Sequence, residues 1–315
     1  MIKAGILGSH NNIKEHLSLL RNMPLFNIIG IHDTNVTENI ELQNQHQLKI
    51  YSQPEEMFQD VDVLFTAPSF NSYQWLQNAI RKSKHLFVNP PVRYNNIETQ
   101  NLIKLSDEAD VVVHIGFKHR YNPAFLAAKP FINPRVRMIH VYNLKQYQNQ
   151  QTINPIDDLM AHDIDNILRI VNSEIKKISA YGMSTSNTSP DIVNAIIEFH
   201  NGCVANLTAG IIASRNKHSA VFYNPKDYIS IDMIKNKAYR YHKNTDNDIA
   251  LFSTNFSDLI QEKIPVKNAN ELEDEINAFS NSILKIQRPE LSLENANRTM
   301  NIIEEIKTKV KLTSN

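Results

Sequence analysis

Short apolar runs alternate with stretches of helical period over the first 120 residues, and this alternation most constrains how the chain can fold. The runs of strand length lie at residues 1–7, 26–33, 49–52, 61–68, 85–89 and 111–117. Strands and helices that alternate at this spacing form a parallel sheet with helices on both faces. We therefore expect residues 1–120 to form an α/β domain.

The pattern changes after Arg120. Residues 155–172 have the period of one long helix, and alternating runs of strand type follow from about Ile178. Asn201-Gly202 stands between two such runs and predicts a hairpin. We expect residues 121–290 to form an α+β domain with a largely antiparallel sheet and a long helix against it.

Two further segments complete the expected organisation. Residues 142–156 are rich in Asn and Gln, and we expect a loop that borders a pocket for a hydroxyl-bearing ligand. Residues 291–315 are expected to form a C-terminal helix that packs back on the rest, with a frayed tail after Lys311.

Composition excludes several classes of protein. Lys+Arg and Asp+Glu are equal at 33 each, so the charge balance favours neither nucleic acid nor an anionic membrane as a partner. The single cysteine, Cys203, excludes an intrachain disulfide framework. No run approaches ~18 apolar residues, and the first residues lack the pattern of a signal peptide. We expect a cytoplasmic protein whose partner is a small-molecule substrate.

The stretch AGILGSHNNIKEHL has the order of a nucleotide-binding turn, in which a strand is followed by a tight turn and a helix. Of the G-x-G-x-x-G glycines only the first, Gly8, is present, while His10 and Ile13 replace the other two. The helix N-terminus still offers free N–H groups to an anion. An ordinary strand–helix turn is the alternative. The cofactor-binding candidates here are Gly8, Ser9, His10 and Asn11.

Asp33 ends the second apolar run, 25 residues after Gly8. A carboxylate there suits the ribose 2′-OH of NAD and disfavours the 2′-phosphate of NADP. A helix-capping aspartate is the alternative. Ligands bind at the carboxyl ends of strands in open α/β sheets, which adds Pro68 and Asn89 to the cofactor-binding candidates.

These features together resemble the Gfo/Idh/MocA family of NAD(P)-dependent oxidoreductases over nearly the whole chain. The resemblance rests on AGILG, VDVLFTAP, SKHLFVNPP, VVVHIGFKHRYNPAF, DLMAHDIDNILRIV and the Asn-Gly hairpin. It implies a Rossmann domain to about residue 120 and a second domain whose open sheet face serves in oligomerisation. It also implies a sugar, inositol or related substrate and a homo-oligomer, either dimer or tetramer.

The chain departs from the family at the end of the fifth apolar run. Such proteins usually carry Glu-Lys-Pro there, whereas this sequence has Asn89-Pro90-Pro91. The lysine normally lies near the reacting oxygen and contributes to proton transfer. Proline has no titratable group and no N–H donor, so Pro90 cannot replace it.

The family's Asp-x-x-x-His pattern is present as Asp158 and His162. Positions 158, 162 and 165 of an α-helix lie within about 60° of one another, so Asp165 shares their face. A histidine can move a proton near neutral pH, and an adjacent carboxylate would orient it and favour its charged form. We expect His162 and Asp158 to be catalytic and Asp165 to bind substrate. A solvated helix face is the alternative.

Lys118 and Arg120 alternate in the run GFKHRYNP, so on a strand they would share one face. As substrate-binding residues they would supply the positive charge that Pro90 lacks. An ordinary pair of basic residues at a domain junction is the alternative.

Three functions remain open from the sequence. The first is an oxidoreductase, with nicotinamide above Gly8, Pro68 and Asn89 and His162 as acid and base. The second is a catalytically silent sensor that binds a nucleotide or sugar. The third is a structural subunit that pairs with an active relative. We expect no metal site, because the histidines lack the spacings of zinc ligands.

Overall fold

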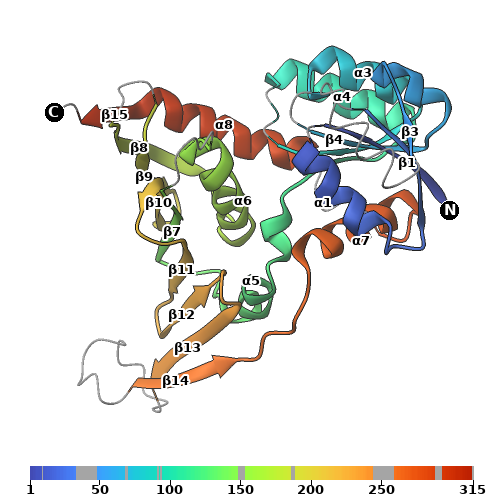
Figure 1. Cartoon of the computed structure of the whole chain (residues 1–315). Coiled ribbons are helices and arrows are strands. Elements are labelled where there is room, and N and C mark those ends of the chain that lie inside the picture. Colours follow the sequence, from blue (N-terminus) through green and yellow to red (C-terminus); the bar gives the residue numbers. More distant parts are fainter. Residues whose placement is uncertain are drawn as a thin grey trace. The chain divides into compact units, whose positions relative to one another are not determined.

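The computed structural model describes residues 1–8, 10–32, 48–67, 70–90, 92, 94–147, 153–185, 189–243, 259–287 and 293–313. The chain divides into two compact units (Figure 1). Unit 1 comprises Met1–Phe117 and Glu273–Met300, and unit 2 comprises Lys118–Leu272 and Asn301–Asn315. Within the described ranges, no helix combines the length and apolar character that a membrane span needs.

Unit 1 is built on a six-stranded parallel sheet, as the sequence predicts. The strand order is β3-β2-β1-β4-β5-β6. The strands are β1 (Ile2–Leu7), β2 (Phe26–His32), β3 (Lys49–Ile50), β4 (Val63–Thr66), β5 (His85–Val88) and β6 (Val113–Ile115). The helices are α1 (His10–Leu20), η1 (Pro54–Gln59), α3 (Tyr73–Arg81), α4 (Asn96–Glu108) and most of α7 (Glu271–Ile283).

Helices cover both faces of this sheet. The helices α3 and α4 lie on one side, and α1 and α7 lie on the other (Figure 1). The helix α4 begins with a capping box, in which Asn95 accepts from the backbone N–H of Glu98 at 2.9 Å and the Glu98 carboxylate accepts from that of Asn95 at 3.0 Å. A side chain on Gly30 would meet the carbonyl oxygen of Lys49 at 2.3 Å, so β2 and β3 pair only with glycine there.

The core of unit 1 holds aromatic rings and one buried acid. Phe87 lies 4.9 Å from the ring of His114 and 5.5 Å from that of Phe279. The carboxylate of Glu275 accepts from the backbone N–H of Phe117 at 2.5 Å and lies 3.3 Å from Nε2 of His114. The buried carboxylate therefore has partners and fixes the end of the β6 segment.

Unit 2 is built on a nine-stranded mixed sheet of order β14-β13-β12-β11-β7-β10-β9-β8-β15. The pairs β7–β10 and β8–β15 are parallel, and the other neighbours are antiparallel. The strands are β7 (Met138–Gln146), β8 (Ile175–Met183), β9 (Ile192–Phe199), β10 (Val204–Ala213), β11 (Lys217–Tyr223), β12 (Asp227–Asp232), β13 (Lys237–Lys243), β14 (Leu259–Ile264) and β15 (Val310–Thr313). Gly202, at φ 84°, closes the predicted hairpin between β9 and β10.

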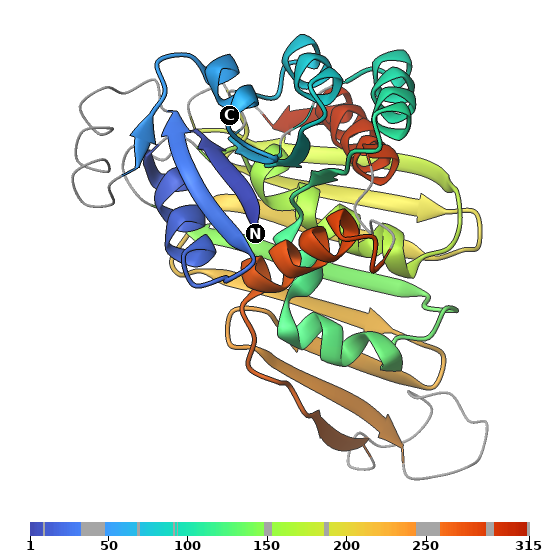
Figure 2. The same ribbon diagram turned by 90° about the vertical axis from the view of Figure 1, so that its right-hand side faces the viewer.

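The described helices of unit 2 include η3 (Lys118–Tyr121), α5 (Pro123–Ala128), η4 (Lys129–Phe131), η5 (Pro155–Met160) and α6 (Ala161–Ile170). Both α5 and α6 lie over the same face of the sheet (Figure 2). The C-terminal helix α8 (Leu293–Lys309) contributes its residues up to Met300 to unit 1 and the rest to unit 2.

Four local predictions were wrong. Residues 142–146, expected in a loop, belong to the central strand β7, whose residues alternate between inward and outward positions. Leu312 and Thr313, expected in the frayed tail after Lys311, belong to β15, which pairs with β8. Residues 118–121 form a 3₁₀ helix, in which positions two apart point in different directions, so Lys118 and Arg120 do not share a face. Residues 155–160 form a π-helix before α6 begins.

Candidate functional site

One candidate site lies at the edge of the unit 1 sheet, at the end of β1. The sheet order reverses here, because β1 lies between β2 and β4. Gly8 follows β1 directly, and its N–H donates to the carbonyl oxygen of His32 at 3.0 Å. The helix α1 begins at His10, which places a helix N-terminus immediately after the turn. This geometry suits an anionic phosphate group.

The structure shows how the turn accommodates a missing glycine. Ile13, in the position of the third glycine, has no exposed surface and belongs to the core. An apolar side chain therefore makes the packing of α1 that the fingerprint assigns to a glycine.

Hydrogen bonds connect the ends of β4 and β5. The N–H of Asn89 donates to the carbonyl oxygen of Thr66 at 3.0 Å, and Asn71 Nδ2 donates to that of Asn89 at 2.6 Å. The hydroxyl of Thr66 donates to Asn71 Oδ1 at 3.1 Å, and that of Tyr94 donates to the carbonyl oxygen of Asn71 at 2.7 Å. Pro90 follows Asn89 and is half-buried. The position of the family lysine therefore belongs to a strand end that is held in place by hydrogen bonds.

Several predicted cofactor-binding positions cannot be placed. Ser9, Asp33 and Pro68 lie outside the described residues, and only the backbone of His10 and Asn11 is described. Their roles stay predictions.

A second candidate site surrounds α6 in unit 2. Asn154 caps the preceding π-helix, since its Oδ1 accepts from the N–H groups of Ile156 and Asp157 at 2.9 and 3.2 Å. The ammonium of Lys307 lies 2.5 Å from the buried carboxylate of Asp157. Asp158 is exposed, and its carboxylate accepts from the backbone N–H of Asn154 at 2.6 Å. Asp158 thus closes the turn that starts the helix.

One face of α6 packs against η3. The rings of His162 and His119 meet edge to face, with centroids 4.5 Å apart and planes at 87°. The guanidinium of Arg120 makes two hydrogen bonds to the carboxylate of Asp165, and both residues are buried, at 4% and 1% exposed. Asn166 Nδ2 donates to the carbonyl oxygen of His119 at 3.3 Å. The predicted common face of His162 and Asp165 exists, but it is covered by η3.

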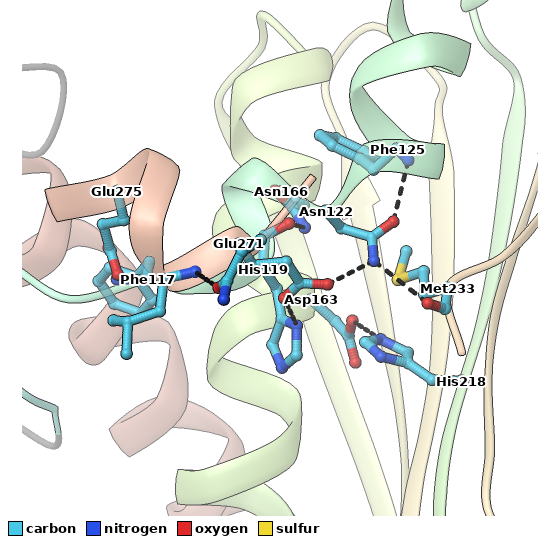
Figure 3. A network of polar contacts seen from close by, with 12 residues as sticks. Phe117, His119, Asn122, Phe125, Asp163, Asn166, His218, Met233, Glu271 and Glu275 are labelled. Carbon is cyan, nitrogen blue, oxygen red and sulfur yellow. Dashed lines mark hydrogen bonds and ion pairs between the residues drawn. The ribbon is translucent and has the colours of Figure 1, made fainter. Parts of the chain in front are cut away.

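The neighbouring residue on α6 points to the sheet. Asp163 is buried, and its carboxylate pairs with Nε2 of His218 at 2.7 Å and accepts from Nδ2 of Asn143 at 3.1 Å. Figure 3 shows Asp163 and His218 beside a second pair, His119 with Glu271. In that pair Nδ1 of His119 lies 3.0 Å from a Glu271 oxygen.

The surroundings shift the pKa values of two predicted catalytic residues. Burial, followed by the charges of His119, Lys118, His218 and Lys145, holds the pKa of His162 well below its usual value. The expectation that a carboxylate favours the charged form of His162 was therefore wrong. Partial burial raises the pKa of the Asp158 carboxyl, an effect that the Asn154 N–H offsets in part.

The structure thus gathers some predicted residues and adds others. Arg120 and Asp165 neutralise each other, which favours a structural role over substrate binding, and half-buried Lys118 contributes positive charge near His162. Sequence analysis missed six polar residues of unit 2, which are His119, Asn122, Asn143, Asp163, His218 and Glu271. The sequence could have indicated Asp163, because it directly follows His162. The others come from distant segments that only the tertiary fold brings together.

Metal ligation has no support in the described part of the chain. No group of three or more His, Cys, Asp or Glu side chains there is arranged to hold an ion.

Comparison with known proteins agrees with this geometry. Residues 2–117 match the Gfo/Idh/MocA model, whose description is "Oxidoreductase family, NAD-binding Rossmann fold". UDP-N-acetylglucosamine 3-dehydrogenase of Acidithiobacillus ferrooxidans is 24% identical over 221 residues, which cover 69% of this chain and 70% of that protein. Myo-inositol 2-dehydrogenase of Thermotoga maritima is 25% identical over 182 residues, about half of each chain (53%).

Solved structures share the fold over nearly the full length. The same A. ferrooxidans dehydrogenase, GnnA, superposes with a TM-score of 0.86 at 19% identity, covering 98% of this chain and 97% of the other. KijD10, a 3-ketoreductase from Actinomadura kijaniata solved with TDP-benzene and NADP, gives a TM-score of 0.79 at 14% identity, covering 99% and 98%.

The sheet topology and the matched model thus place residues 2–117 in the class of NAD-binding Rossmann domains. Residues 2–117 match the NAD-binding domain of the Gfo/Idh/MocA family of NAD(P)-dependent oxidoreductases, and the chain as a whole is similar to distant members of that family.

Proposed function

We propose that this protein interconverts a secondary alcohol and a ketone on a sugar, a polyol or a nucleotide sugar, with NAD(P) as hydride carrier. The observation that carries the proposal is His162, which stands at the family's histidine position on α6 and is held in its neutral form. A neutral imidazole can accept a proton, which oxidation of an alcohol requires.

The residues of unit 1 fit the cofactor. Gly8 and the N-terminus of α1 lie where the sheet order reverses, the usual place of a pyrophosphate. When bound, the cofactor supplies or accepts the hydride. Asp33 is the residue that we expect to prefer NAD over NADP.

Side chains of the protein itself carry out the proton transfer. In the oxidation direction, a ring nitrogen of His162 takes the hydroxyl proton while the carbon hydride leaves to the cofactor, and the carbonyl forms. Lys118 supplies positive charge near His162, where the substrate oxygen becomes negative, and so takes over part of the role of the lysine that Pro90 replaces. We expect Asp158, which is exposed at the start of the helix, to contact the substrate's hydroxyl groups.

A nucleotide sugar is the substrate class to test first. The dehydrogenase from A. ferrooxidans acts on UDP-N-acetylglucosamine by its name, and it covers this chain over 98% of its length in structure. Free sugars and inositols are the second class, because the T. maritima relative is an inositol dehydrogenase by name.

A catalytically silent sensor is the second candidate. It is favoured by Pro90, which offers no proton, and by His10 and Ile13 in place of two fingerprint glycines. Such a protein would bind a nucleotide or sugar without turnover.

We further propose a homo-oligomer formed through the sheet face of unit 2 that α5 and α6 leave uncovered. Large side chains are exposed on β7 and β8, namely Met138, Tyr142, Tyr181 and Met183. Sedimentation at several protein concentrations tests this proposal. Replacing Tyr142 and Tyr181 with Lys should give monomers.

The decisive experiment is a screen of NAD- and NADP-linked turnover with UDP-sugars, free sugars and inositols. His162→Asn should lower turnover by about 10²–10⁴-fold and leave cofactor affinity unchanged. His200→Asn, a histidine in the exposed β9–β10 turn, is the matched control and should remain as active as the wild type. Cofactor binding with no turnover on any substrate would support the sensor instead.

A further inference from the structure

His119 occupies the centre of a group of three histidines in unit 2. Its ring lies 4.5 Å from that of His162 and 5.2 Å from that of His218, with the planes at 87° and 85°. Edge-to-face contacts of this kind orient rings as well as bury them. A change at His119 therefore acts directly on the ring of His162.

Glu271 fixes the ring of His119. One carboxylate oxygen lies 3.0 Å from Nδ1 of His119, and the other accepts from Nδ2 of Asn122 at 2.6 Å. Asn122 in turn accepts from the N–H of Phe125 at the start of α5 (Figure 3). Because an ionised carboxylate only accepts hydrogen bonds, Nδ1 of His119 must carry a proton.

Glu271 stays ionised in this setting. Burial alone raises the pKa of its carboxyl, but the hydrogen bond and charge of His119, the hydrogen bond of Asn122 and the charge of Lys118 outweigh burial and lower it. The ionised carboxylate therefore holds the ring of His119 through a charge-assisted hydrogen bond to Nδ1.

The backbone of His119 is fixed as well. Its carbonyl oxygen accepts from Asn166 on α6, and the neighbouring Arg120 pairs with Asp165 on the same helix. The backbone of His119 is thus tied to the helix that carries His162, while its ring is held by Glu271, so the contact between the two rings is built into the fold.

We propose that His119, clamped by Glu271, is a positioning residue that orients the ring of His162 and keeps it neutral and ready to accept a proton. The role rests on the proposed function of His162. It assigns to this chain a second titratable group beside the reacting histidine, in place of the lysine replaced by Pro90.

His119 also acts on the protonation of His162, through charge. Burial lowers the pKa of His162 most, and charge interactions lower it further, with His119 first, followed by Lys118, His218 and Lys145. A cation next to a buried imidazole opposes its protonation. Loss of His119 should therefore let His162 take up a proton at higher pH.

The test follows the titration of His162 by NMR of the histidine Cε1–H groups in the full chain, assigned by the signal missing in His162→Asn. Two variants separate packing from charge. His119→Phe keeps a ring and loses the charge, and His119→Asn loses both but keeps a donor for Glu271. His200→Asn is the control. We expect the midpoint of His162 to rise by about one pH unit in both His119 variants and to stay unchanged in the control.

Turnover adds a second readout. In the oxidation direction, the acid limb of kcat/KM should move to higher pH in both His119 variants, and His119→Asn should also lower kcat at the pH optimum. An unchanged midpoint of His162 in both folded variants would overturn the role of His119. The NMR result needs no substrate, so it stands apart from the turnover screen that tests the proposed function.

Discussion

At the scale of single residues, the pair of Arg120 and Asp165 shows how burial changes the meaning of a charge. As separate residues of a sequence, both suit substrate binding. In the structure they face each other with almost no exposed surface. A buried ion pair of this kind fixes geometry, and here it fixes η3 against α6.

Breaking this pair should destabilise the protein strongly. Arg120→Met or Asp165→Leu leaves one buried charge without its partner and should lower the free energy of unfolding by about 3–5 kcal/mol. Urea denaturation measures the change. The double variant Arg120→Met/Asp165→Leu should recover much of the loss, because both charges are gone. Losses that simply add in the double variant would contradict this account.

His162 gives stability a defined dependence on pH. Its pKa is lowered in the folded state, so below the unfolded value of about 6.5 the unfolded chain binds a proton that the folded chain resists. The stabilising contribution is complete above about pH 6.5. It is lost as the pH falls toward the folded pKa, at up to about 1.4 kcal/mol per pH unit.

Urea titrations from pH 7.5 to 5 measure this slope for the wild type and for His162→Asn. The slope should be smaller in the variant. Burial also lowers the pKa of His85. His85 is present in both proteins, so its contribution to the slope cancels in the comparison. Equal slopes would mean that His162 titrates normally.

At the scale of elements, β15 shows how a terminal segment is held. Val310 pairs with Ala180 and Leu312 with Gly182 at the edge of the nine-stranded sheet. A side chain on Gly182 would meet Leu312 Cδ2 and Val310 Cγ1 at 3.2 Å, so the two strands approach closely.

Removing residues 310–315 should expose the edge of β8. We expect a loss of about 1–3 kcal/mol of stability, because paired backbone groups and two apolar contacts are lost. Hydrogen exchange should become faster at the β8 amides and stay unchanged in β12, which serves as an internal control. Unchanged exchange in β8 would mean that β15 does not pair in solution.

An element could be predicted from the sequence when the interactions that form it are local, and could not when they are long-range. Strands of unit 1 were predictable because apolar runs bounded by turns suffice for a parallel sheet. The strand at residues 142–146 could not be predicted, because it contains Asn143, a polar residue that is buried and donates to Asp163. The four residues of β15 are too few for alternation to distinguish a strand from a frayed end. The turn of η3 depends on contacts with α6, which no local pattern contains.

At the scale of the whole molecule, the two units divide the proposed chemistry. Unit 1 supplies the turn after β1 for a dinucleotide, and unit 2 supplies His162 and its partners. The resemblance to the family predicted His162 and Asp158, and the order of strand, turn and helix predicted Gly8, from sequence alone. The polar pairs of η3 beside His162 join residues 45 to 152 positions apart, namely Arg120 with Asp165 and His119 with Glu271, and so they required the tertiary fold.

The measurement that most directly tests the central claim is a calorimetric titration of the full chain with NADH and with NADPH, repeated on His162→Asn. The account predicts micromolar binding of NADH, weaker binding of NADPH, and the same affinities in the variant. Failure of both dinucleotides to bind at millimolar concentration would contradict it, because the turn after β1, with His10 and Ile13 in place of glycines, would then not hold the cofactor.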